Sequence, residues 1–202
     1  MPTFERIADV LKHYTVGIAG AGGLGSNVAM ALTRIGIGKL VIADFDVVSE
    51  SNLNRQFYFH DQIGHKKVQV LKENLLRINS KIDVEIHDIK LNKNNILKVF
   101  SGVDVMVEAF DKADMKEMII EIFQSEKPQI PLVVGNGMAG WGNSNTLNVQ
   151  QFGNLYVCGD NHSEIDDELP PIAPRVGICA FMQANVVATI LLNKNLNTNI
   201  NP

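Results

Sequence analysis

The fold is decided by residues 15–25, TVGIAGAGGLG, in which a short apolar run leads directly into a cluster of glycines. Residues 15–20 have the composition of a buried β-strand, and from residue 24 to residue 35 the apolar side chains recur at helical spacing. A strand, a glycine-rich turn and a helix in this order are typical of a nucleotide-binding βα unit. The stretch therefore predicts a nucleotide site.

The glycines of this turn have different expected tasks. Gly20 permits the tight turn, Gly22 lets the backbone approach a phosphate group, and Gly25 allows the helix to pack closely on the strand, with Gly23 completing the cofactor-binding turn. The N–H groups at the start of the helix then face the negative charge. Asp44 lies at the end of the second predicted strand, at the usual distance of ~20 residues for an acid that binds ribose hydroxyls. The alternative is an aspartate that only caps the next loop.

Beyond this unit, strands and helices continue to alternate. Further strands are predicted over 40–43, 82–86, 103–109 and 132–134, and further helices over 66–78, 94–100 and 115–122. This alternation predicts an α/β protein with a Rossmann-like, doubly wound, mainly parallel sheet. At 202 residues, a single domain over 1–202 is expected.

The last third of the chain has a different texture. Residues 145–152 and 155–158 are predicted to form strands of an antiparallel C-terminal addition, and the acidic stretch 160–174 is predicted to be a flexible, solvated loop. A helix over 175–192 is apolar on most faces, which predicts burial in the domain or at a subunit interface. The Asn-rich segment 193–202 is expected to be a frayed tail.

Composition excludes several classes of protein. The net charge of −4 leaves no basic excess to displace counterions from a nucleic acid, so no nucleic-acid partner is expected. The two cysteines form no CxxC pair, which argues against a disulfide framework and a structural zinc site. The longest apolar stretch, near 179–192, is shorter than the ~20 residues that span a bilayer. A cytoplasmic protein without a signal peptide or membrane contact is expected.

Polar residues with matching chemistry follow the predicted strands: Asp44, Asp46, Asn52, Arg55, Gln56, Lys67 and Asp111. An NAD-dependent oxidoreductase keeps its cofactor's phosphates intact and has little use for this set, although it remains the alternative. Nucleotidyl transfer needs cations on the β- and γ-phosphates of ATP, and usually Mg²⁺ held by a carboxylate. Arg55 offers a bidentate fork, Lys67 a compact charge, and Asp111 a carboxylate at the ligand-binding edge of the sheet.

Five segments together resemble the ThiF/MoeB/HesA adenylyltransferases, which are relatives of the ubiquitin-activating enzymes. These segments are residues 20–25, 44–46, 51–56, 63–67 and 108–111. The resemblance spans about residues 15–137, and the short length together with residues 173–178 looks most like the small thiamine-biosynthesis ThiF group. It implies that ATP adenylates the C-terminal glycine of a ubiquitin-like sulfur carrier ending in Gly-Gly, with release of pyrophosphate.

The resemblance also implies roles for single residues. It assigns Asp44 to the ribose, and it makes Asp46 and Gln56 neighbours in the site. It assigns Asn52, Arg55 and Lys67 to the phosphates. Asp111 is assigned to Mg²⁺ and to catalysis, together with Arg55 and Lys67. A homodimer is implied as well. A non-catalytic nucleotide-binding scaffold of the same fold remains a further reading.

The chain departs from the family pattern in three places. The paired CxxC zinc ligands of larger relatives are absent, so no zinc is expected. Relatives carry an N-terminal helix whose arginine reaches the partner subunit's nucleotide, whereas Arg6 lacks the surrounding pattern and is more simply a surface arginine. Cys158 follows a predicted strand and is a candidate for an exposed reactive thiol, while Cys179 lies in an apolar helix and is expected to be buried.

Overall fold

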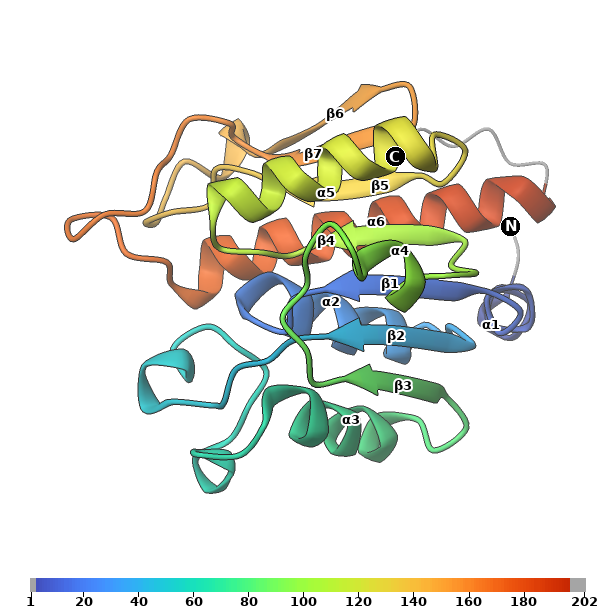
Figure 1. Cartoon of the computed structure of the whole chain (residues 1–202), viewed down its shortest axis with the longest axis horizontal. Coiled ribbons are helices and arrows are strands. Elements are labelled where there is room, and N and C mark those ends of the chain that lie inside the picture. Colours follow the sequence, from blue (N-terminus) through green and yellow to red (C-terminus); the bar gives the residue numbers. More distant parts are fainter. Residues whose placement is uncertain (1–2, 197–202) are drawn as a thin grey trace.

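The computed structural model of the protein describes residues 3–196, which form one seven-stranded sheet with helices on both faces (Figure 1). The strand order is β3-β2-β1-β4-β5-β7-β6. The strands are β1 (Thr15–Ala19), β2 (Lys39–Ala43), β3 (Asp83–His87), β4 (Val105–Glu108), β5 (Leu132–Gly135), β6 (Asn148–Phe152) and β7 (Leu155–Gly159). The helices are α1 (Phe4–Leu11), α2 (Gly23–Arg34), α3 (Lys67–Ile78), α4 (Ile96–Val99), α5 (Ala113–Glu126) and α6 (Ala173–Leu196). The predicted doubly wound architecture is confirmed.

The sheet is parallel except at one end. β1 pairs in parallel with β2 and with β4, and β5 pairs in parallel with β4 and with β7. β6 runs antiparallel to β7, so the two form a hairpin at the sheet edge, as the antiparallel addition predicted. The chain builds outward from β1 to β3 and then crosses back to β4, which makes the boundary between β1 and β4 the topological switch point. Ligands of such sheets bind outside the carboxyl ends of the strands at this point.

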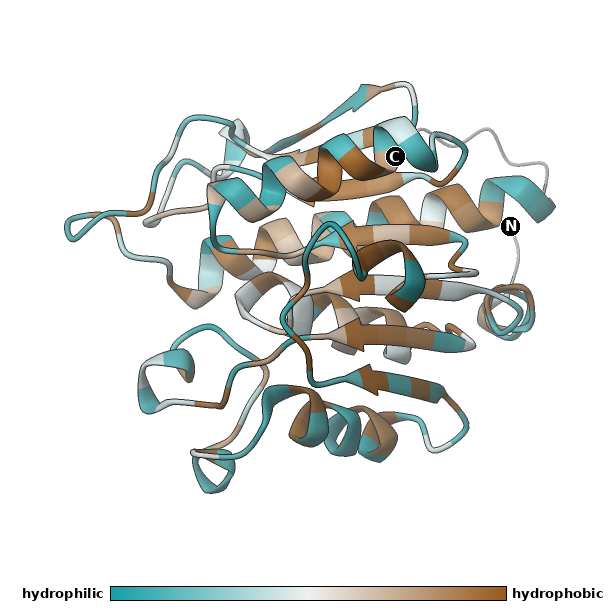
Figure 2. Ribbon diagram, viewed as in Figure 1, coloured by the Kyte–Doolittle hydropathy of each residue, from teal (hydrophilic) through white to brown (hydrophobic). Residues whose placement is uncertain are grey.

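Two apolar cores lie on the two faces of the sheet, and Figure 2 shows the apolar strands between them. In β4, Val105 and Val107 face the core that α2, α3 and α6 cover, whereas Met106 faces the core under α4 and α5. Successive side chains of a strand point to opposite faces, so a strand buried on both sides is apolar along most of its length. This explains why the central strands are continuous apolar runs.

Helix α1 was not predicted from the sequence. Its eight residues are too few to show a convincing helical period, but Thr3 caps it by accepting a hydrogen bond from the backbone N–H of Arg6 at 3.3 Å. Leu11 at its end is fully buried in the core. Gly38 permits the close approach of this segment, because a Cβ atom there would lie 1.9 Å from the carbonyl oxygen of Lys12. Tertiary packing therefore stabilises this short helix.

Helix α6 is longer than predicted. It continues through residues 193–196, so the expected frayed tail is wrong for this part, and residues 197–202 lie outside the described region. By length and composition α6 could cross a membrane, which corrects the expectation that the apolar stretch is too short. Buried residues make up 44% of its most apolar window, and it packs along α2, β5 and β7. The side chain of Gln183 lies within this core and donates hydrogen bonds to the carbonyl oxygens of Glu108 and Val133.

Candidate active site

A cavity of about 300 Å³ opens at the carboxyl ends of β1, β2 and β4. The sheet register aligns these ends, because Ala19 pairs with Ala43 on one side and with Glu108 on the other. The residues that follow the three strands therefore meet at one edge. Nine residues predicted for the site line this cavity: Gly20, Gly22, Gly23, Asp44, Asp46, Arg55, Gln56, Lys67 and Asp111.

The glycine turn forms the floor of the cavity with its backbone. Gly20 has a φ of +103°, and a Cβ atom there would lie 2.7 Å from the carbonyl oxygen of Ala109. A Cβ atom on Gly25 would lie 1.9 Å from the carbonyl oxygen of Gly20, which bears out the expected close packing of helix and strand. A Cβ atom on Gly22 would meet only the Nε2 atom of Gln56, at 3.8 Å, so the backbone is open to a ligand there.

Helix α2 starts at this turn without a side-chain cap, since Gly22 occupies the N-cap position. The first N–H groups of a helix have no partner within the helix and carry its positive dipole end. Within residues 3–196 no side-chain oxygen caps the start of α2, so these N–H groups can bind an anion. The turn therefore has the geometry of a phosphate site.

Asp44 is fixed against the glycine turn. Its Oδ2 atom accepts a hydrogen bond from the N–H of Ala21 at 2.7 Å, and its Oδ1 atom accepts one from the N–H of Asp46 at 2.8 Å. Burial raises the pKa of this carboxyl, although both hydrogen bonds and the charge of Lys67 oppose the rise. A carboxylate accepts several hydrogen bonds, so Asp44 keeps capacity for a ligand hydroxyl.

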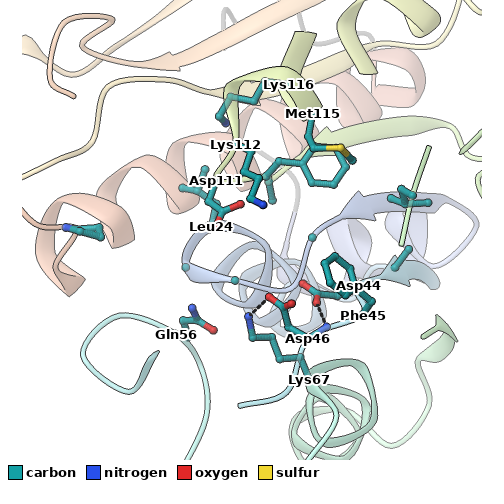
Figure 3. Close-up of a pocket in the computed structure, with 18 of the residues that line it drawn as sticks. Leu24, Asp44, Phe45, Asp46, Gln56, Lys67, Asp111, Lys112, Met115 and Lys116 are labelled. Carbon is teal, nitrogen blue, oxygen red and sulfur yellow. Dashed lines mark hydrogen bonds and ion pairs between the residues drawn. The ribbon is translucent and has the colours of Figure 1, made fainter. Parts of the chain in front are cut away.

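Lys67 and Asp46 form an ion pair beneath the turn, at 2.9 Å between Nζ and Oδ2 (Figure 3). The lysine side chain is only 7% exposed, whereas Asp46 is half exposed. The backbone N–H of Lys67 also donates to the carbonyl oxygen of Asp46, which fixes the start of α3 at the cavity. The pair holds a desolvated cation in place before any anion binds.

Arg55 lies across the cavity wall and packs its aliphatic part near Gly23. Its Nη1 atom donates hydrogen bonds to the carbonyl oxygen of Ser51 at 3.0 Å and to Oδ1 of Asn54 at 2.8 Å. Burial lowers the pKa of the guanidinium, and the charge of Asp111 opposes that change. Arg55 and Asp111 are therefore close enough to interact although they are 56 positions apart in the chain.

Asn52 is the predicted phosphate ligand that does not line the cavity. Its Oδ1 atom accepts a hydrogen bond from the N–H of Ser49 at 3.1 Å and so closes the 3₁₀ turn Glu50–Asn52. Gln56, in contrast, lines the cavity and is 9% exposed, and its Oε1 atom has no hydrogen-bond partner among residues 3–196. Buried polar atoms are rarely left unpaired, so Gln56 offers an acceptor to a ligand.

Tyr58 and Glu108 support the turns of the site without lining the cavity, and the sequence did not predict them as site residues. The buried hydroxyl of Tyr58 donates a 2.7 Å hydrogen bond to the carbonyl oxygen of Ala21 and supports the glycine turn, and burial raises its pKa well above the ordinary value. Glu108 is fully buried, and both of its carboxylate oxygens lie 2.9 Å from Nζ of Lys116. Burial raises the pKa of Glu108, and the Lys116 ammonium opposes that rise. The sequence signal that could have identified Glu108 is a charged residue inside an otherwise apolar strand.

The Glu108–Lys116 pair shapes the turn that carries Asp111. The Oε1 atom of Glu108 accepts a 2.6 Å hydrogen bond from the N–H of Phe110, and Lys116 also donates to the carbonyl oxygen of Gly135. These contacts fix the turn between β4 and α5 at Phe110 on the strand side and at Lys116 on the helix side. Figure 3 shows the side chains of Asp111 and Lys112 pointing from it toward the glycine turn.

Both cysteines are buried, and Arg6 lies outside the cavity. Cys158 is fully buried in β7, so the expectation of an exposed thiol is wrong, and burial raises its pKa. Cys179 is buried as expected. Burial raises its pKa to about 12, and its thiol donates to the carbonyl oxygen of Cys158. Neither thiol is available as a thiolate near neutral pH. Arg6 is exposed on α1 and does not line the cavity.

The carboxylates at 164–168 of the acidic loop are exposed to solvent, as predicted, but the loop also contributes to the cavity. Ile165 and Pro171 both line it. Arg175, in the first turn of α6, is buried and forms an ion pair with Asp160 at the end of β7, while its Nη1 atom donates to the carbonyl oxygen of Gly142. These contacts attach the ends of the loop to the rest of the fold.

The donor set at the cavity suits Mg²⁺ better than a metal held by protein alone. Within residues 3–196, no group of three or more His, Cys, Asp or Glu side chains is arranged to hold a metal ion. Mg²⁺ is commonly bound through one or two carboxylates together with phosphate oxygens and water. Asp111 is exposed at the cavity and meets this requirement.

Two curated proteins are similar to this chain in sequence. The adenylyltransferase and sulfurtransferase MOCS3 of Caenorhabditis briggsae is 35% identical over 190 residues, which are 89% of this chain and 46% of that protein. The ubiquitin-like modifier-activating enzyme 5 of Caenorhabditis elegans is 41% identical over 122 residues, which are 60% of this chain and 27% of that protein. The chain thus spans less than half the length of these relatives.

A solved structure is similar in fold. Escherichia coli TcdA, a tRNA N6-threonylcarbamoyladenosine dehydratase solved in complex with ATP, has a TM-score of 0.86, and the match covers 96% of this chain and 92% of TcdA at 20% identity. At this identity the likeness supports the fold alone. The model of the ThiF family matches residues 3–202, nearly the whole sequence. The chain therefore belongs to the ThiF family.

Proposed function

We propose that this protein uses ATP to adenylate the C-terminal glycine carboxylate of a ubiquitin-like sulfur carrier ending in Gly-Gly, and that it releases pyrophosphate. The observation that carries the proposal is the meeting of Asp44, Arg55, Lys67 and Asp111 around one open glycine turn. Membership of the ThiF family and the similarity to an adenylyltransferase and sulfurtransferase support it.

The chemistry follows from where charge develops. The glycine backbone and the start of α2 bind phosphate oxygens, and Asp44 accepts hydrogen bonds from the ribose. The substrate carboxylate attacks the α-phosphate, and the bond to pyrophosphate breaks. Arg55 and Lys67 stabilise the negative charge that accumulates on the leaving pyrophosphate. Mg²⁺ held by Asp111 would neutralise phosphate charge when it is bound.

The choice of a carrier protein as substrate rests on the family and on the relatives. MOCS3 is described as an adenylyltransferase and sulfurtransferase, and the ubiquitin-like modifier-activating enzyme 5 by its name acts on ubiquitin-like proteins. TcdA, by contrast, is a tRNA dehydratase, so tRNA is the competing substrate class. The net charge of −4 favours the protein substrate. We propose thiamine biosynthesis in the cytoplasm as the setting, and no zinc requirement.

A homodimer is also part of the proposal. The outer face of α6 exposes Ile178 and Phe181, which are 38% and 49% accessible, in the same stretch of helix. Adjacent exposed apolar side chains on one helix are typical of an interface. Sedimentation equilibrium of Phe181→Glu beside the unaltered protein tests this point, and a monomer in both cases contradicts it.

The decisive experiment is ATP–pyrophosphate exchange with a candidate carrier ending in Gly-Gly. Exchange should depend on the carrier, and Asp111→Ala should reduce it by about a hundredfold or more, the size seen when one group that stabilises transition-state charge is removed. Asp61→Ala, which removes an exposed carboxylate outside the cavity, should leave the rate unchanged.

The alternatives give different outcomes in the same assay. Exchange that depends on tRNA and not on a carrier would support the tRNA substrate. Tight NAD binding without any exchange would support an oxidoreductase, and ATP binding without exchange would support a scaffold. Each of these results contradicts the proposed function.

A further inference from the structure

We propose that Lys112 is a phosphate-binding residue of this site, which holds the triphosphate of ATP against the glycine turn. The inference rests on the proposed function, because it concerns the same cavity. It assigns a role to a residue that the sequence motifs did not include. The side chain of Lys112 lines the cavity beside Asp111.

The other cations that line the cavity already have partners, and among them the Lys90 ammonium lies over the ring of Phe45, 5.9 Å from its centroid. Lys67 is paired with Asp46, and Lys116 is paired with the buried Glu108. Arg55 donates to a backbone carbonyl and to a side-chain amide. The ammonium of Lys112 forms neither an ion pair nor a hydrogen bond with any of residues 3–196. The Lys112 ammonium can therefore bind an anion without losing an existing contact.

The backbone position of Lys112 supports this role. Lys112 is the N-cap of α5, its carbonyl oxygen accepts the first helical hydrogen bond from Lys116, and its side chain forms no capping hydrogen bond. Ser, Thr, Asp and Asn are preferred at an N-cap because their side chains satisfy free N–H groups. A lysine there lacks this benefit and places a positive charge at the positive end of the helix dipole. Residues that break a local rule without evident compensation are found at functional sites.

The surroundings of Lys112 indicate which ligand would compensate for the unfavourable positive charge at this N-cap. Figure 3 shows the amine of Lys112 pointing from the β4–α5 turn toward the glycine turn, where Gly22 leaves the backbone open. An anion between these two turns would contact the start of α2 and the ammonium together. A phosphate group of the nucleotide has this chemistry and lies on this turn in the proposed reaction.

The test uses Lys112→Asn, which removes the charge and supplies a preferred N-cap. Titration calorimetry should show ATP binding weakened about tenfold, the effect of one charge-assisted hydrogen bond, with adenosine binding unchanged. The thermal unfolding temperature should stay equal or rise, because the new cap stabilises α5. A purely structural role for Lys112 predicts the opposite change in stability. Lys112→Arg should bind ATP within about threefold of the unaltered protein, since it keeps the charge.

The matched control is Lys127→Asn, which makes the same substitution at the exposed C-cap of the same helix, outside the cavity. It should bind ATP normally. Equal ATP affinity in Lys112→Asn and the unaltered protein overturns the inference, and so does a parallel loss of adenosine binding. If the unaltered protein binds neither ATP nor inorganic pyrophosphate, the proposed function and this inference both fail. ATP binding without pyrophosphate exchange contradicts only the proposed reaction.

Discussion

Two turns at neighbouring strand ends form the site, and they are built in opposite ways. The glycine turn after β1 presents backbone, and the positions of Gly20 and Gly25 show that it leaves no space for side chains there. The β4–α5 turn presents side chains and requires a buried ion pair beneath them. The first turn thus depends on steric space and the second on electrostatic support. Substitutions that fill the space at the glycine turn or remove the ion pair under the β4–α5 turn distinguish the two kinds of support.

The largest effect is expected from Gly25→Ala. Its Cβ atom would lie 1.9 Å from a backbone oxygen, so the glycine turn must move. We expect the free energy of unfolding to fall by about 3 kcal/mol, at the upper end for overpacking, because no flexible side chain can give way. Urea denaturation measures this change. Gly177→Ala is the control, since no atom lies within 4 Å of a Cβ atom there. It should stabilise α6 by about 0.5–1 kcal/mol, and equal effects of the two would contradict the steric account.

The second largest loss of stability is expected from Glu108→Ala, which removes the support of the β4–α5 turn. The substitution leaves Lys116 without its carboxylate and the N–H of Phe110 without its acceptor. Removing one partner of a buried pair is strongly destabilising, so we expect a loss of about 2–3 kcal/mol, less than for a fully buried lysine because Lys116 is 22% exposed.

Glu121→Ala is the control for Glu108→Ala, because it removes an exposed ion pair with Lys93 at the other face of α5. Exposed pairs contribute about 0–1 kcal/mol, so its effect should be small. Urea denaturation compares the two variants. A similar loss in both would show that the buried pair does not support the turn.

The smallest effect is expected from Tyr58→Phe. The variant keeps the ring and removes only the hydrogen bond to the carbonyl oxygen of Ala21. We expect a loss of about 1 kcal/mol, which is typical of one buried hydrogen bond. Tyr14→Phe provides the comparison, because it removes a partly exposed hydroxyl outside the cavity that accepts a hydrogen bond from the side chain of Asn195. An unchanged midpoint in urea for Tyr58→Phe would mean that the glycine turn needs no support beyond its own backbone.

The fold was largely predictable because its signals are local. Continuous apolar runs marked the central strands, and the glycine cluster marked the first crossover, so the doubly wound sheet and its hairpin were confirmed. Helix α1 was missed because its burial at Leu11, and not its sequence period, stabilises it. The extent of α6 was underestimated because its last turn is rich in asparagine.

The candidate site was predictable only in part. Gly20, Asp44 and Lys67 follow from motif and spacing, and they line the cavity. Asn52 matches the same motif but closes its own turn instead. Cys158 was placed in the wrong environment because a cysteine after a strand can face either side, and burial depends on what packs over it.

The sequence by itself determined the type of fold, the glycine turn and the identities of the charged residues that could serve a nucleotide. Hydrophobic period, turn chemistry and motif spacing are properties of neighbouring residues, so they can be read along the chain. Only the tertiary structure decided which charges are already paired, because ion pairs such as Lys67 with Asp46 join a loop and a helix start that are distant in the chain and meet in space. Lys112 lines the cavity, and its ammonium has no ion-pair partner among the described residues. Its sequence neighbours could not show this, because pairing depends on contacts made in the folded chain.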